Sequence, residues 1–119
     1  MEKVKISTYK DLVVWQKAML LVEDIYKTTK KLPSEEKFGL ISQIQRSAVS
    51  VPSNIAEGSG RGTRKEYSQF LKIARGSIFE LETQINLLNR LYSVEISNLL
   101  NQTTEISKIL NTIIKKLEY

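Results

Sequence analysis

Apolar side chains recur along this chain at alternating steps of three and four residues. Such steps place side chains on one face of an α-helix, so each line predicts an amphipathic helix that packs against its neighbours. The first two lines are Leu12, Trp15, Met19, Val22 and Tyr26, then Ile41, Ile44, Ala48, Val51 and Ile55. The last two are Tyr67, Leu71, Ala74, Ile78, Leu81, Ile85, Leu88 and Tyr92, then Ile96, Leu99, Thr103, Ile106, Leu110, Ile113 and Leu117.

Residues typical of helix ends lie between these lines. Ser34, followed by acidic residues, predicts the start of the second helix, and the glycine-containing turn at residues 58–62 predicts its end. Thr63, with Glu66 three residues later, is a capping box for the third helix. Ser93 is expected to cap the fourth helix.

Four helices joined by short turns predict an all-α fold, an antiparallel up-down-up-down four-helix bundle. No stretch alternates with a period of two residues for long enough to predict a sheet. The 119 residues suffice for a single domain, 1–119, with a short N-terminal tail at residues 1–8. Pro52 lies inside the second helix and removes a hydrogen bond to Ala48, so we expect a kink near Ala48 to Pro52.

The amino-acid composition excludes several kinds of catalytic and metal-binding site. The chain has no Cys and no His, which leaves no thiol nucleophile, imidazole base, disulfide or zinc-binding cluster. Ser50 lacks a recognisable base, and the turn at 58–62 lacks the Gly-Lys-Ser/Thr end of a phosphate loop. We therefore expect no enzyme activity, no metal and no cofactor. No apolar run reaches the ~20 residues of a membrane helix, and the N-terminus lacks a secretory signal, which indicates a cytoplasmic protein.

A polar strip lies beside the apolar line of the second helix, and a counterpart follows the third helix. The residues that we predict to form a subunit interface or a buried polar network are Gln43, Arg46, Ser50, Asn54, Glu57, Ser77 and Glu80. Several neighbours are small, whereas exposed helix faces favour long side chains, and Gly76 in mid-helix is unfavourable unless another backbone approaches closely. In that interpretation Arg46 is buried and pairs with Glu80. The alternative is a plain solvated face.

Several segments together resemble one known family. They are DLVVWQKA at 11–18, GLISQIQRSA at 39–48, SVPSNIAEG at 50–58, FLKIARGS at 70–77 and ELETQ at 80–84. This set resembles the bacterial four-helix-bundle family first noticed in intervening sequences of large-subunit ribosomal RNA genes. The likeness runs from about Tyr9 to Leu91, and the fourth helix agrees only in its pattern. Gln45 departs from it, because the family usually has a second arginine beside Arg46.

The resemblance implies a four-helix bundle that assembles into a ring-like homo-oligomer, typically a pentamer. A related branch, the accessory proteins of diversity-generating retroelements, uses a basic barrel of this kind to bind nucleic acid and a reverse transcriptase. For most of the family the molecular role is unsettled.

The charge of the chain agrees with a polyanionic partner. Its 18 basic and 13 acidic residues give a net charge of +5, and assembly multiplies this charge. The residues expected to contact RNA or DNA are Lys17, Arg46, Arg61, Arg64, Lys65, Lys72 and Arg75. We therefore expect a non-enzymatic homo-oligomer that binds nucleic acid. The alternative is a protein-interaction or structural module without that affinity, in which the basic residues scatter around the assembly.

Overall fold

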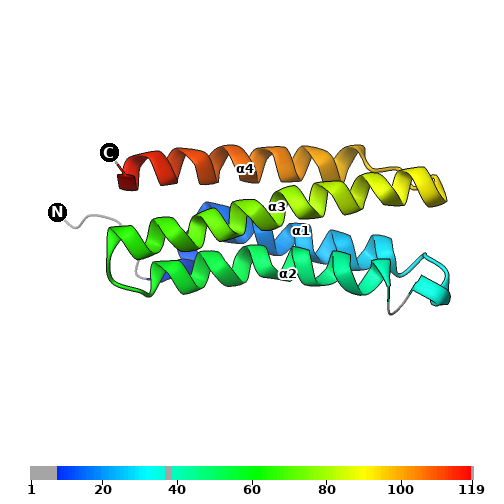
Figure 1. Ribbon diagram of the computed structural model, residues 1–119, viewed down its shortest axis with the longest axis horizontal. Helices are drawn as coiled ribbons and strands as arrows, with labels where there is room; N and C mark the ends of the chain where they lie inside the picture. Colours follow the sequence, from blue (N-terminus) through cyan, green and yellow to red (C-terminus); the bar gives the residue numbers. More distant parts are fainter. Residues whose placement is uncertain (1–7, 37–38, 119) are drawn as a thin grey trace.

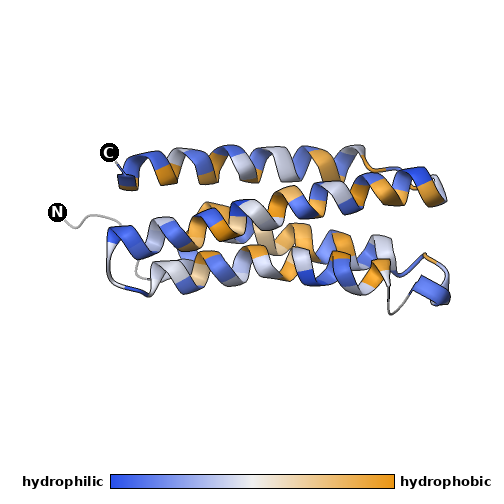
Figure 2. Ribbon diagram, viewed as in Figure 1, coloured by the Kyte–Doolittle hydropathy of each residue, from blue (hydrophilic) through white to orange (hydrophobic). Residues whose placement is uncertain are grey.

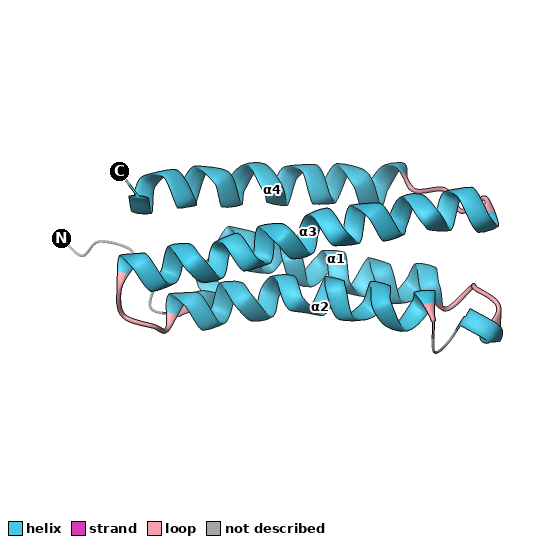
Figure 3. Cartoon of the chain, viewed as in Figure 1, coloured by secondary structure: helices cyan, strands magenta, loops and turns pink. Residues whose placement is uncertain are grey.

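Four long helices account for most of the chain in the computed structural model, which describes residues 8–36 and 39–118 (Figure 1). The helices are α1 (Val13–Thr29), α2 (Leu40–Ser59), α3 (Arg64–Tyr92) and α4 (Ser97–Glu118), with short 3-10 turns at Tyr9–Asp11 and Ser34–Glu36. The described residues contain no strand, as Figure 3 also shows. The predicted all-α four-helix fold is confirmed.

The helices form a square in cross-section. Within the described part of the chain α1 contacts α2 and α4, and α3 contacts the same two helices, so α1 and α3 lie at opposite corners. The colours in Figure 1 run in opposite directions along successive helices, so the chain passes up and down the bundle. The result is an elongated body with extents of 53 × 27 × 22 Å.

The core confirms three of the four predicted apolar lines. Ile44, Val51 and Ile55 of α2 are fully buried, as are the central members of the α3 and α4 lines. Figure 2 shows the matching alternation of hydrophobic and hydrophilic residues along each helix. The side chains of this central core come from all four helices and are Val14, Ala18, Leu21, Ile25, Ile44, Ala48, Val51, Ile55, Leu71, Ala74, Ile78, Leu81, Ile85, Leu88, Leu99, Ile106, Leu110 and Ile114.

The apolar line predicted for α1 is wrong, because a neighbouring strip of the same helix faces the core. Residues Val14, Ala18, Leu21 and Ile25 face the core, and they obey the same helical spacing as the line expected from the sequence. The expected line lies at the edge instead, where the side chains of Met19 and Tyr26 are 39% and 44% exposed. Helix α1 is therefore apolar on two adjacent strips, and spacing alone does not tell which of them faces inward.

The predicted cap of α3 is confirmed. The Thr63 hydroxyl accepts a hydrogen bond from the backbone N–H of Glu66 at 3.1 Å and donates one to the Glu66 carboxylate, also at 3.1 Å. This pairing satisfies a free amide of the first turn and places a negative charge at the positive end of the helix.

The predicted cap of α4 is wrong. Ser93 instead ends α3 in the left-handed conformation, with φ 56° and ψ 33°. Helix α4 begins four residues later, where the Glu95 carboxylate accepts from the backbone N–H of Ser97 at 2.8 Å and from its hydroxyl at 2.7 Å. The hydrogen bond from the Ser97 hydroxyl is the main reason that the pKa of Glu95 lies below its ordinary value.

Helix α2 begins later than predicted. Ser34 opens a separate 3-10 turn, and α2 starts at Leu40, whose backbone N–H donates to the Glu36 carboxylate at 3.4 Å. Tyr92 at the end of α3 also donates its hydroxyl to Glu36, and this bond is the main cause of a raised pKa of Tyr92. Pro52 is buried inside α2, which is helical on both sides of it, and the kink there stays a prediction.

Candidate functional site

Helices α2 and α3 meet along a line of short polar side chains. The Ser47 hydroxyl donates to the Glu80 carboxylate at 2.6 Å, and the hydroxyls of Ser50 and Ser77 lie 2.8 Å apart. The Asn54 amide donates to the backbone carbonyl of Ser50 at 2.8 Å. Ser47 is buried, and Ser50, Asn54 and Ser77 are half-buried. The structure thus joins four residues of the predicted polar set through intrachain hydrogen bonds, with Ser47 as an additional member.

Gly58 explains how the two helices come so close. A Cβ atom at this position would lie 2.7 Å from the Cβ of Phe70 and 3.1 Å from a ring carbon of Tyr67. Only glycine fits such a contact without movement of the neighbours. The sequence pattern indicated a helix end here, but Gly58 lies inside α2 and is buried against α3.

The remaining residues of the predicted polar set are exposed in the single chain. Arg46 is exposed and does not form the expected buried pair with Glu80, which accepts a hydrogen bond from Ser47. Gln43 and Glu57 are exposed as well, and Glu80 is exposed although it accepts the hydrogen bond from Ser47. For these side chains burial does not occur within one subunit, and the subunit interface stays the prediction.

Basic residues gather where α3 begins and α4 ends. Arg64 donates to the backbone carbonyls of Lys116 and Leu117, which are free acceptors at the end of α4. Lys72 pairs with Glu118, and this hydrogen bond is the main reason that the pKa of Glu118 lies below its ordinary value. We call this region the basic end and define it by Arg61, Arg64, Lys65, Lys72, Lys115 and Lys116.

Lys115 and Lys116 were not singled out by sequence reasoning. They lie more than forty residues from Lys72 in the chain, and only the return of α4 along α3 brings them to the same end. Their place in the last turn of α4 is a sequence signal in itself, because cations there complement the helix dipole.

The seven predicted nucleic-acid contacts do not form one continuous face. Arg75 extends the basic end along α3 and donates to Asn111 at 2.8 Å. Arg61 lies 3.6 Å from a Glu57 oxygen and 4.8 Å from the centre of the Phe70 ring. Lys17 lies on the α1–α4 side and pairs with Glu105 at 3.0 Å, while Arg46 lines a hollow between α2 and α3. Five of the seven therefore gather at or beside the basic end.

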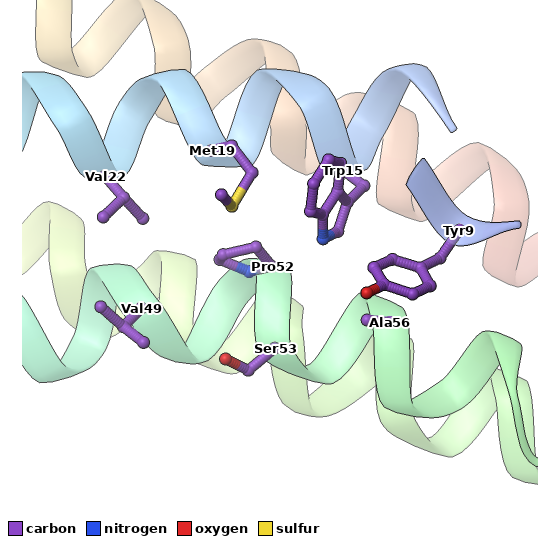
Figure 4. Close-up of a pocket in the computed structure, with 8 residues that line it drawn as sticks. All are labelled: Tyr9, Trp15, Met19, Val22, Val49, Pro52, Ser53 and Ala56. Atoms are coloured by element: carbon purple, nitrogen blue, oxygen red, sulfur yellow. The ribbon is translucent and has the colours of Figure 1, made fainter. Parts of the chain in front are cut away.

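An apolar hollow lies between α1 and α2. Figure 4 shows Trp15, Met19 and Val22 of α1 facing Pro52 and Ala56 of α2 across it. The complete lining is Tyr9, Trp15, Met19, Val22, Val49, Pro52, Ser53 and Ala56. The second apolar strip of α1 thus borders this hollow and does not enter the core.

Residues 8–36 and 39–118 contain no group of three or more His, Cys, Asp or Glu side chains placed to hold a metal ion. None of the four helices there is both long and apolar enough to cross a membrane.

Comparison with known proteins identifies the family. The family model of the 23S rRNA-intervening sequence protein matches residues 10–112. The chain belongs to this family. A crystal structure of a protein with unknown function from the S23 ribosomal protein family of Bacteroides thetaiotaomicron VPI-5482 is 33% identical and superposes with a TM-score of 0.80. The match covers 87% of this chain and 99% of that chain. No curated protein matches this intervening sequence protein.

The departure at Gln45 has a local role in this intervening sequence protein. Its side-chain amide donates to the Thr29 hydroxyl at 3.2 Å, and Thr29 is buried at the end of α1. The position therefore joins α2 to α1 with a neutral hydrogen bond and adds no charge beside Arg46.

Proposed function

We propose that this chain is a cytoplasmic, non-enzymatic homo-oligomer that binds RNA or DNA at its basic end. The observation that carries the proposal is the gathering of six cationic side chains there. Three carboxylates lie among them, on Glu57, Glu66 and Glu118. Family resemblance supports a pentamer as the assembly.

Phosphate groups are the chemistry that suits this end. Arg64 and Lys65 lie in the first turn of α3, where cations oppose the helix dipole, and a bound anion would remove that penalty. Lys65, Lys115 and Lys116 are exposed, so their ammonium groups are accessible to a backbone phosphate.

Assembly increases the positive electrostatic potential that a nucleic acid would meet. Each subunit adds a net charge of +5, so an oligomer presents several basic ends to one polyanion. Binding through phosphates alone depends little on the base sequence. Its affinity falls steeply as the salt concentration rises, because binding releases counterions from the nucleic acid. We therefore expect salt-sensitive binding with little preference among sequences.

Fluorescence anisotropy with labelled RNA and DNA at low salt tests this proposal. Exchange of Lys65, Lys115 and Lys116 for Gln should weaken binding by about tenfold or more and should lower the salt dependence. The matched control exchanges Lys27, Lys30 and Lys31, three exposed lysines at the far end of α1, for Gln. Equal losses in both triple variants would remove the basic end as the site. Wild-type protein that binds neither nucleic acid would remove the function.

A protein-interaction module is the second candidate function. The apolar hollow between α1 and α2 favours it, because Met19 and Val49 are 39% and 40% exposed there. Solution mass by light scattering, together with absorbance at 260 nm of the purified protein, separates the candidates. An oligomer without bound or bindable nucleic acid supports the module.

A further inference from the structure

Phe79 is a large aromatic side chain that the bundle leaves 52% exposed. It lies at the edge of α3 that meets α4, where the two helices run side by side (Figure 1). Arg75, four residues earlier, donates to Asn111 of α4 at 2.8 Å. Glu82, three residues later, accepts from the Thr103 hydroxyl of α4 at 2.9 Å. The ring of Phe79 therefore lies between two contacts to α4 and is enclosed by neither.

The α4 residues level with this ring include a lysine. The two hydrogen bonds fix the register of α3 on α4, so the ring of Phe79 lies level with the positions midway between the two α4 partners, 107 and 108. Ser107 has a short side chain, which agrees with the open ring, and Lys108 is exposed. An exposed aromatic ring and an exposed ammonium group therefore lie at the same height on neighbouring helices.

Further cations continue this edge toward the basic end. Steps of four and three residues along α4 place Lys108, Lys115 and Glu118 on the side of Asn111. Lys115 is exposed, and Glu118 pairs with Lys72 of α3. We name this surface the α3–α4 face and define it by Lys72, Arg75, Phe79, Lys108 and Lys115. Its four cations exceed the two carboxylates beside them, and each carboxylate already accepts a hydrogen bond from a side chain of this chain.

An exposed aromatic ring among cations suits a single-stranded nucleic acid. The bases of a single strand can turn outward and stack on an aromatic side chain, whereas both flat faces of a base in a duplex are covered by its neighbours. Such stacking accepts every base, because each has a π-face. Lys72 lies seven residues from Phe79, about 10 Å along the helix, so one strand can contact both the ring and the basic end.

We propose that the α3–α4 face binds a single-stranded nucleic acid, with one base stacked on Phe79 and the flanking phosphates held by the cations of this face. This inference rests on the proposed function and deepens it. Contacts to phosphates alone accept single strands and duplexes alike, and the ring adds a preference for unpaired bases.

Two substitutions of Phe79 separate stacking from plain apolar contact. Phe79→Leu keeps an apolar side chain but removes the aromatic ring, and Phe79→Trp keeps a ring. Fluorescence anisotropy with labelled oligouridine, oligothymidine and a DNA duplex measures the three affinities. Phe79→Leu should bind the single strands about tenfold more weakly than the wild type and the duplex equally well, whereas Phe79→Trp should bind the single strands at least as tightly. A loss confined to one of the two single strands identifies the ligand as RNA or as DNA.

The salt dependence distinguishes the ring from the cations. A stacked ring carries no charge, so Phe79→Leu should weaken single-strand binding by the same factor at every salt concentration. Lys108→Gln should lower the salt dependence instead. Leu20→Ala is the matched control, because Leu20 is an apolar side chain of α1 that is 57% exposed, and it should leave all three affinities unchanged. Circular dichroism should show equal helicity for every variant.

The outcomes that contradict this inference differ from those that contradict the proposed function. Phe79→Leu protein that binds single strands as tightly as the wild type, or that loses affinity for the duplex to the same extent, overturns the stacking site and leaves the basic end in place. Wild-type protein that binds none of the three nucleic acids overturns both.

Discussion

The α2–α3 contact and the α1–α4 contact hold the bundle together in different ways. Between α2 and α3 three serines, Ser47, Ser50 and Ser77, take part in the polar contacts, and Gly58 is buried against Phe70 and Tyr67. Between α1 and α4 the polar contacts are made by long side chains at the rim, such as Lys17 to Glu105 at 3.0 Å and Gln102 to Asp24 at 2.8 Å. Both pairs of helices also bury apolar seams of the same spacing.

This difference indicates separate roles for the two kinds of contact. The buried apolar residues hold each pair of helices together, and the polar side chains set how closely the two helices approach. Short side chains lose little conformational freedom when they become ordered, so a hydrogen bond between two serines favours one register of α2 on α3. Long exposed side chains lose more freedom and remain screened by water, so they contribute little. The α2–α3 pair should therefore be the more sensitive to substitution.

Gly58→Ala should give the largest effect. The new methyl group would lie 2.7 Å from the Cβ of Phe70, and we expect the two helices to separate at a cost of about 1–3 kcal/mol in the free energy of unfolding. Urea denaturation followed by circular dichroism measures it. Gly60→Ala is the matched control, because its nearest atoms would be 3.7 Å and 3.8 Å away. Equal stability of the two variants would contradict the close approach.

The Ser50–Ser77 hydrogen bond should give an intermediate effect. A double-mutant cycle with Ser50→Ala and Ser77→Ala should yield a coupling energy of about 1 kcal/mol, because both hydroxyls are half-buried. If the losses of unfolding free energy in the two single variants add up to the loss in the double variant, the two hydroxyls do not stabilise each other.

The Lys17–Glu105 pair should give a smaller effect. The two side chains are 35% and 55% exposed, so the same cycle with alanine should yield a coupling energy below about 0.5 kcal/mol. Raising the salt concentration should reduce it further. A coupling equal to that of the serine pair would erase the contrast between the two contacts.

The smallest effect should come from Glu118, where α4 pairs with α3. Its pKa is lowered in the folded state by the hydrogen bonds from Lys72 and Ser68. A lowered folded pKa stabilises the fold above the unfolded pKa, and this contribution is lost as the pH falls through the folded pKa. Denaturation curves should therefore show a smaller acid-induced loss of stability for Glu118→Gln than for the wild type. An unchanged pH profile would argue against the Lys72 contact in solution.

Much of the fold could be predicted because spacing carries direct physical information. The apolar lines predicted for α2, α3 and α4 hold most of the buried side chains of those helices, and Thr63 with Glu66 satisfies a local rule of helix capping. The prediction of the buried face failed for helix α1, because a second apolar strip has the same spacing as the first. The predicted cap of α4 at Ser93 failed, because a serine can also end a helix in the left-handed conformation.

The candidate site was harder to predict, because it depends on which chain segments meet in space. Lys115 and Lys116 reach the start of α3 only through the fold, and Arg46 was expected to be buried on the basis of a strip that is partly exposed. The small residues around Ser50 predicted close packing, because exposed helix faces favour long side chains, and the structure places the hydroxyls of Ser50 and Ser77 2.8 Å apart.

An even number of helices brings the two described ends of the chain to the same end of the bundle. Tyr9 packs beside Ala56 near the end of α2, and Glu118 lies against Lys72 near the start of α3 (Figure 1). A peptide linker can therefore join the two ends of one chain, and a circular permutant opened in one of the turns between helices should keep the four-helix packing.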